Sequence, residues 1–365
     1  MGMDVVYDHQ VLSTQEFGGI SRYIVELAAG MAERADTHVT ILAPFHMNGF
    51  LRERRPRSLV GWHAPPVRRT ARLRSFANDA ISRAWLAARP PSILHETYYR
   101  ARSLGRPGTP TVITVYDMIH ERFAELYPDS DRTAELKAAA VHRAAAVICI
   151  SESTRRDLLE RLPIEPGKVS VVHLAHAPHA AGLDGEPPIQ RPYLLYVGHR
   201  RAYKNFHSLL LAMAGSKLTR ELRLVCFGGG PFTGEELHAA SALGLQSEAL
   251  VQQDGDDDLL SRMYAHATAF VYPSLYEGFG IPVLEAMSFG CPVACSNTSS
   301  LPEVAGDAAE YFDPACPDAI AAAICRIVES PARADELRRR GLERVTSFSW
   351  DRCARETHDV YRRLL

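Results

Sequence analysis

Two glutamates flank a short glycine-rich turn in the C-terminal half of the chain. Glu277 and Glu285 stand on either side of Gly-Phe-Gly-Ile-Pro at 278–282, directly after an apolar run. Proline suits the first turn of a helix, where an N–H would stay unpaired, so we expect a helix over 282–289 with Ile281 as its cap. Free N–H groups at a helix start, left accessible by glycine, bind anions. The segment therefore predicts a diphosphate site, with the backbone of Phe279, Gly280 and Ile281 facing the phosphates.

The two carboxylates differ in their distance from the predicted helix start. Glu285 lies one turn into the helix, where an acceptor-only side chain suits the hydroxyls of a ribose. Glu277 lies on the preceding loop, and we expect it beside a sugar or a centre that develops positive charge. Ribose, diphosphate and sugar in this order form a nucleotide sugar. For two isolated glutamates we would favour a helix-dipole partner at Glu285 and a solvated loop charge at Glu277, but the turn between them favours the ligand site.

The segment YVGHRRAYKNF at 196–206 contains basic residues that could neutralise a diphosphate leaving group. Fixed cations stabilise the charge that builds on a departing phosphate oxygen. We expect Arg200 and Lys204 to fill this role, with a solvated loop as the alternative. FGGGPF at 227–232 predicts a turn near the nucleotide. In the N-terminal half, Gly18 and Gly19 lack side chains, so a phosphate or the acceptor could approach their backbone closely. A helix cap is the alternative explanation for these glycines.

Alternating strand and helix patterns must position these residues. Apolar strand-like runs alternate with helix-period segments twice along the chain, which predicts an α/β protein with two Rossmann-like domains. We expect an N-terminal domain over 1–180, a Pro- and Gly-rich linker over 181–191, and a C-terminal domain over 192–346. A terminal helix within 347–365, capped by Ser349, is expected to pack back across the domains.

Composition narrows the class of protein. The 365 residues are 46% hydrophobic and 23% charged with a net charge of −2, which argues against a nucleic-acid-binding protein. The seven cysteines lack zinc-site spacing and indicate neither a metal nor disulfides. Neither a signal peptide nor a spanning segment stands out, so we expect a cytoplasmic protein.

The two C-terminal motifs, together with EFGGISRYIVELA at 16–28, resemble the retaining glycosyltransferases of family 4. The similarity covers essentially the whole chain and points to the mannosyltransferase-like group of surface-polysaccharide synthesis. It implies the GT-B fold, with two Rossmann-like domains facing each other across a cleft. It also implies a nucleoside-diphosphate sugar bound by the C-terminal domain, an acceptor bound by the N-terminal domain, and catalysis without a metal or other cofactor.

The resemblance also implies roles for individual residues. Glu277 would face the donor sugar, Glu285 the ribose, and Arg200 with Lys204 the diphosphate. Arg200 is an inexact match, because the family pattern often has arginine where this chain has His199 or Tyr203. In TVYDMIHERF at 114–123 a tyrosine replaces the usual histidine, which leaves Asp117 and His120 to contact the reacting sugar or the acceptor.

Arginines cluster between residues 52 and 74, at positions 52, 54, 55, 57, 68, 69, 72 and 74. The cluster predicts a peripheral contact with the inner membrane face or a lipid-linked diphosphate acceptor, with a solvated loop as the equal alternative. The predicted activity is transfer of a hexose, mannose by resemblance, to a hydroxyl of a glycan or lipid-linked acceptor. A sugar-nucleotide epimerase, a phosphorylase and a non-catalytic nucleotide-sugar-binding protein remain as alternatives.

Overall fold

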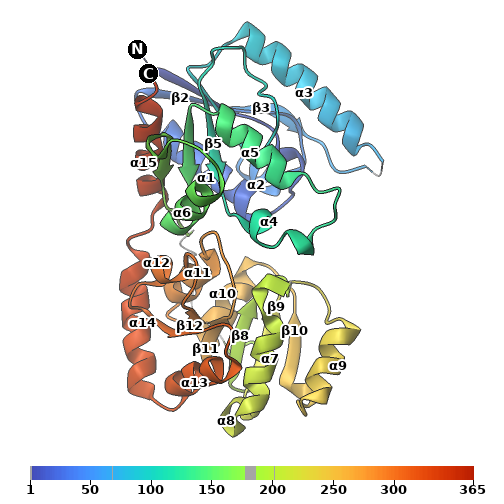
Figure 1. The fold of residues 1–365 in the computed structure, drawn as a ribbon, viewed down its shortest axis with the longest axis vertical. Helices are drawn as coiled ribbons and strands as arrows, with labels where there is room; N and C mark the ends of the chain where they lie inside the picture. Colours follow the sequence, from blue (N-terminus) through green and yellow to red (C-terminus); the bar gives the residue numbers. More distant parts are fainter. Residues whose placement is uncertain (1, 68, 177–185, 201) are drawn as a thin grey trace. The chain divides into compact units, whose positions relative to one another are not determined.

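The computed structural model describes residues 2–67, 69–176, 186–200 and 202–365 (Figure 1). Arg68, Arg201 and residues 181–185 of the predicted linker lie outside the described residues. The chain divides into two compact units. Unit 1 comprises Met1–Leu174 and Ser349–Leu365, and unit 2 comprises Ala175–Phe348.

Unit 1 is built on a parallel sheet with the strand order β3-β2-β1-β4-β5-β6-β7. Its strands are β1 (Met3–Tyr7), β2 (Thr37–His46), β3 (Leu59–His63), β4 (Ile93–Glu96), β5 (Thr111–Val115), β6 (Ala146–Cys149) and β7 (Val169–Val171). Its helices are α1 (Gly19–Ala32), α2 (Gly49–Arg54), α3 (Ala71–Ala88), α4 (Ile119–Arg122), α5 (Thr133–Arg143), α6 (Glu152–Arg161) and α15 (Trp350–Arg362). Short 3-10 turns lie at Val11–Ser13, Ala124–Leu126 and Pro166–Lys168. The central strands are buried, as expected for a parallel sheet covered by helices.

The C-terminal helix α15 packs on α1 of unit 1 (Figure 1). Ser349 caps it by accepting a hydrogen bond from the N–H of Arg352. Tyr361 is fully buried, and its hydroxyl bonds to His95 of β4 and, at 3.1 Å, to the hydroxyl of Tyr7 of β1. The last helix of the chain is thus tied to the first strand of unit 1.

Unit 2 has a second parallel sheet, ordered β10-β9-β8-β11-β12-β13. Its strands are β8 (Tyr193–Val197), β9 (Arg223–Phe227), β10 (Leu250–Gln253), β11 (Ala269–Tyr272), β12 (Val293–Ser296) and β13 (Ala309–Phe312). Its helices are α7 (Phe206–Gly215), α8 (Lys217–Glu221), α9 (Gly234–Ala242), α10 (Asp257–His266), α11 (Ile281–Ser288), α12 (Leu301–Ala305), α13 (Pro317–Val328) and α14 (Pro331–Val345). Short 3-10 turns lie at Ala202–Lys204 and Ser247–Ala249.

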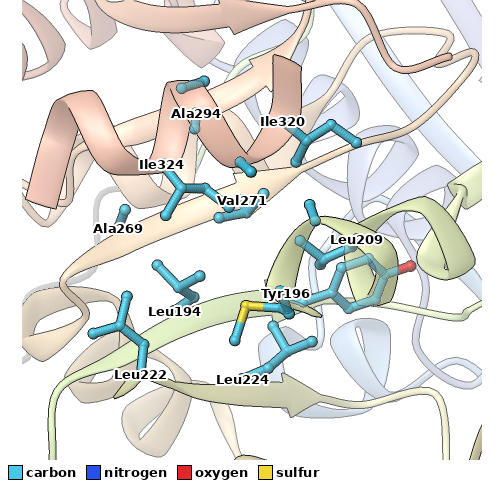
Figure 2. Close-up of a cluster of buried hydrophobic side chains, with 14 of the residues drawn as sticks. Leu194, Tyr196, Leu209, Leu222, Leu224, Ala269, Val271, Ala294, Ile320 and Ile324 are labelled. Atoms are coloured by element: carbon cyan, nitrogen blue, oxygen red, sulfur yellow. The ribbon is translucent and has the colours of Figure 1, made fainter. Parts of the chain in front are cut away.

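A dense apolar core supports the sheet of unit 2 (Figure 2). Leu194, Leu224 and Val271 point from adjacent strands toward Leu209 of α7 and Ile324 of α13. These side chains are fully buried, so each contributes about 1.5–3 kcal/mol of hydrophobic stabilisation. The core fixes the strands whose carboxyl ends carry the predicted donor-site residues.

Candidate functional site

The predicted anion site forms the start of α11 in unit 2. Gly280 is the N-cap with a φ of 107°, a left-handed value that favours glycine. A Cβ at this position would lie 2.7 Å from Leu301 Cδ2. The helix begins at Ile281 and ends at Ser288, so the prediction of Ile281 as cap and a start at 282 was wrong by one residue. The left-handed glycine, rather than the residue before proline, turns the chain into the helix.

Lys204 and Glu277 meet beside this helix start. Lys204 Nζ donates to Glu277 Oε1 at 2.6 Å and to the Tyr272 hydroxyl at 3.0 Å. The two charged side chains are only 14% and 10% exposed. Lys204 follows β8 and Tyr272 is the last residue of β11, and these two strands are neighbours in the sheet. Carboxyl ends of adjacent parallel strands therefore build the cluster.

The cluster keeps Lys204 charged. Burial lowers the pKa of the Lys204 ammonium, but the neighbouring Glu277 carboxylate and Tyr272 outweigh this effect, so the pKa stays well above its usual value. A cation is consequently held in a largely desolvated position, where its interaction with an anion is stronger than in water.

Two serines after β12 fix the loop that carries Glu277. The Ser299 hydroxyl accepts from the Glu277 N–H at 3.0 Å. The Ser300 hydroxyl bonds to the carbonyl oxygens of Glu277 and Phe279 at 2.9 and 2.8 Å. The loop before α11 is thus held in place by side chains that follow β12, the neighbouring strand of the sheet.

Glu285 projects from the second turn of α11. Its Oε2 accepts a hydrogen bond from the Tyr264 hydroxyl at 3.3 Å. The Tyr264 ring stacks on Phe289 with centroids 6.0 Å apart and an interplanar angle of 7°. This aromatic packing fixes the direction of the Glu285 carboxylate, whose predicted role toward a ribose stays a prediction.

Arg200 faces the glycine turn. Its side chain is 3% exposed, and its Nε pairs with Glu236 at 2.8 Å. It also donates to the carbonyl oxygens of Gly230 and Pro231, both at 2.9 Å. Gly228, Gly229 and Gly230 all have positive φ values. These contacts give Arg200 a positioning role at the predicted 227–232 turn, and its contact with a diphosphate remains a prediction.

Asp117 and His120 lie in unit 1, after β5. Asp117 Oδ1 accepts from the Ile119 N–H at 3.0 Å and lies 3.8 Å from Nζ of Lys137. His120 stacks on Tyr127 with ring centroids 4.1 Å apart. Burial lowers the pKa of His120. The histidine therefore has a packing partner, and the catalytic roles of both residues stay predictions.

Gly18 and Gly19 begin α1 in unit 1. Gly18 is the N-cap, and a Cβ there would approach Gln15 Oε1 to 2.6 Å. A Cβ at Gly19 would meet no heavy atom within 4 Å. The end of the flexible Gln15 side chain is thus the contact at the first glycine, and the second has open space beside it.

Three contributors to the unit 2 site were missed by the sequence analysis: Tyr272, Ser299 and Ser300. Tyr272 is the last residue of an apolar strand, and both serines follow the next strand. Side chains at the carboxyl ends of parallel strands gather at one sheet edge, and this signal could have identified them. In the described part of the chain, no helix is long and apolar enough to cross a membrane, and no His, Cys, Asp or Glu cluster could hold a metal ion.

Two family models match the chain, one in each half. The model for glycosyltransferase family 4 matches residues 17–175, and the model for glycosyl transferases group 1 matches residues 185–344. Together they span most of both units.

Relatives and solved structures agree with this match. The O-antigen chain mannosyltransferase B of Escherichia coli is 39% identical over 47% of this chain and 46% of the relative. The serotype-specific mannosyltransferase WbdA of Escherichia coli is 29% identical over 70% of this chain and 34% of the relative. The chain thus spans less than half the length of these two relatives. Sucrose-phosphate synthase from Thermosynechococcus elongatus has the same fold, with a TM-score of 0.74, 19% identity, and coverage of 100% of this chain and 99% of that one.

Proposed function

Because the chain belongs to the family 4 glycosyltransferases, we propose that it moves a hexose, with mannose as the best inference, from a nucleoside-diphosphate sugar to a hydroxyl of a glycan or lipid-linked acceptor. We further propose that the sugar keeps its anomeric configuration and that the reaction needs no metal or other cofactor. Similarity to the two mannosyltransferases supports the choice of sugar.

The observation that carries this proposal is the buried Lys204–Glu277 pair beside the start of α11. In the proposed complex, the backbone of Phe279, Gly280 and Ile281 binds the diphosphate, and Lys204 neutralises it. Glu285 takes the ribose hydroxyls. Glu277 orients the hexose and stabilises positive charge at its anomeric carbon.

The proposed chemistry places charge where these groups can stabilise it. The bond between the anomeric carbon and the diphosphate oxygen breaks, and the electron pair stays on the oxygen beside Lys204. The acceptor oxygen bonds to the anomeric carbon on the same face, and its proton passes to the departing phosphate. A double displacement through a carboxylate nucleophile is the second route to retention.

The acceptor side of the proposal concerns unit 1. Asp117 and His120 would contact the acceptor hydroxyl or the reacting sugar, with Gly19 leaving room for the ligand. The arginines between 52 and 74 and the 71% exposed Trp62 would contact an anionic membrane surface. We propose that the protein acts in the cytoplasm, at the inner face of the membrane. Retained liposome binding after Arg69→Ser and Arg72→Ser would contradict this contact.

Release of nucleoside diphosphate tests the donor site. The protein would be incubated with GDP-mannose and other nucleotide sugars, with and without lipid or glycan acceptors. Glu277→Gln and Lys204→Met should each lower the rate about 100-fold or more, because each removes a charge that acts on the breaking bond.

The exposed residues Glu248 and Lys217 provide matched controls, since Glu248→Gln and Lys217→Met make the same chemical changes elsewhere in unit 2. Wild-type rates in folded Glu277→Gln and Lys204→Met would refute the site. Binding of donor without turnover, under every acceptor condition, would instead identify a nucleotide-sugar-binding protein. Interconversion of the donor without transfer would identify an epimerase.

A further inference from the structure

Unit 1 contains a pocket of about 530 Å³ at the carboxyl end of β1. The loop after β1, the first turns of α3 and the residues after β4 form its walls. The polar side chains used below are those of Arg74, Ser75, Tyr98 and Arg100. The pocket lies within unit 1 and shares no residue with the cluster around Lys204 in unit 2.

The pocket lining contains two arginines and no carboxylate. Arg74 reaches Met47 Sδ at 3.7 Å, and among the described residues no carboxylate lies within ion-pair distance of it. An arginine that is half-buried without an acidic partner has a charge available for an external anion.

Arg100 is the second cation of the pocket, and it is held in place. Its Nη2 donates to Asp79 Oδ1 at 3.1 Å, while its side chain is 15% exposed. Its Nε is buried and has no hydrogen-bond partner within the described part of the chain. The same Asp79 oxygen bonds to His9 Nε2 at 3.1 Å, and burial lowers the pKa of His9. Asp79 therefore orients Arg100 and leaves the pocket with an excess of positive charge.

The lining also contains hydroxyl groups, among them those of Tyr98 and Ser75. Burial raises the pKa of Tyr98 to about 12, so its hydroxyl keeps its proton and can donate. Ser75 is exposed one residue after Arg74. Two guanidinium groups with one acidic partner, Asp79 beside Arg100, together with hydroxyl groups suit a ligand rich in anionic oxygens rather than a neutral sugar.

We propose that this pocket binds a phosphate or diphosphate group of the acceptor, with Arg74 and Arg100 as its cationic ligands. The inference rests on the proposed glycosyl transfer and specifies the class of acceptor. The phosphate could belong to a lipid diphosphate or to a soluble sugar phosphate. The 70% and 73% exposed Leu73 and Phe76 of α3, next to Arg74 and Ser75, would suit the lipid.

Calorimetry on the full chain tests the pocket with three probes: inorganic pyrophosphate, geranylgeranyl diphosphate and mannose 1-phosphate. A saturating nucleoside diphosphate would be present to occupy the donor site. Arg74→Gln and Arg100→Gln should each weaken binding of the preferred probe about tenfold or more, since each removes a charged hydrogen-bond donor. Arg74→Lys should lose less than Arg74→Gln, because it keeps the charge.

Arg83→Gln and Arg102→Gln are matched controls, since both are exposed arginines of unit 1 that do not line the pocket. Equal losses in test and control variants, or no binding of any probe to the wild-type chain, would overturn the proposal. Preference for geranylgeranyl diphosphate would assign a lipid acceptor, and preference for mannose 1-phosphate a soluble one. Release of nucleoside diphosphate by the wild-type chain separates this proposal from the proposed function. No release with any donor would contradict the proposed function, whereas release by a chain that binds none of the three probes would overturn the phosphate pocket alone.

Discussion

Lys204 and Glu277 are two opposite charges that share one buried position. Removing one partner of such a pair leaves the other charge without compensation and costs far more than the pair contributes. The pair is therefore weak evidence for stability and stronger evidence for a functional site.

A double-mutant cycle separates the two contributions. Glu277→Leu should lower the free energy of unfolding of unit 2 by about 3 kcal/mol, because the Lys204 ammonium stays buried without its carboxylate. Lys204→Met combined with Glu277→Leu should recover most of this loss while remaining inactive. Far-UV circular dichroism in urea would measure both effects. Tryptophan fluorescence would not report on unit 2, because all three tryptophans, Trp62, Trp85 and Trp350, lie in unit 1. Additive losses in the double variant would contradict the coupling.

Sequence reasoning at the residue scale selected Lys204 and Glu277 because both follow recognisable strand ends, and the structure brings the two side chains together. Their roles toward a donor stay predictions. Sequence reasoning could not foresee the surroundings of Arg200. The guanidinium meets Glu236 and the carbonyl oxygens of the glycine turn, which come from other parts of the chain. Spacing along a sequence does not reveal such partners.

At the scale of elements, the start of α11 depends on one left-handed glycine. Gly280 and Gly290 flank the same helix, with φ values of 107° and 66°. A Cβ at Gly280 would collide with Leu301, whereas a Cβ at Gly290 would meet no atom within 4 Å. An alanine at either position would have an unfavourable positive φ, but only the alanine at 280 would also clash with a neighbouring side chain.

This difference predicts unequal effects of the same substitution. Gly290→Ala should destabilise unit 2 by about 1 kcal/mol and leave donor binding unchanged, because it adds backbone strain alone. Gly280→Ala should cost more and weaken nucleotide binding, because the new Cβ must displace either the fully buried Leu301 side chain or the helix start. Urea denaturation and nucleotide titration would measure the two effects. Equal nucleotide affinity in the two variants would contradict the assignment of the helix start as the diphosphate site.

At the scale of the whole chain, the prediction of two Rossmann-like domains of the GT-B class is confirmed by the two parallel sheets and by the likeness to sucrose-phosphate synthase. Alternating strand and helix patterns carry this information locally. The association of α15 with unit 1 depends on packing between residues more than 200 positions apart, such as Tyr361 and His95. The terminal helix was expected to pack back across the domains, and its pattern alone did not reveal that it belongs to unit 1.

The junction of α15 with unit 1 also makes the molecule sensitive to acid. His95 is fully buried between Tyr361 and the Thr114 hydroxyl, which lies 2.9 Å from its Nε2. Burial lowers the pKa of His95 to about 3 from an ordinary value of 6.5. Above pH 6.5 the histidine is neutral in both the folded and the unfolded chain. Below pH 6.5 the unfolded chain binds a proton that the folded unit does not. The stability of unit 1 therefore decreases as the pH is lowered.

We therefore expect unit 1 to lose up to about 1.4 kcal/mol of stability per pH unit through His95 between pH 6.5 and its folded pKa. His95→Gln should reduce this slope, even if it destabilises unit 1 at neutral pH. Urea denaturation at several pH values, followed by tryptophan fluorescence, would report on unit 1, where all the tryptophans lie. The exposed His142 provides the control, since His142→Gln should keep the wild-type slope. An unchanged slope in His95→Gln would show that other groups cause the acid sensitivity.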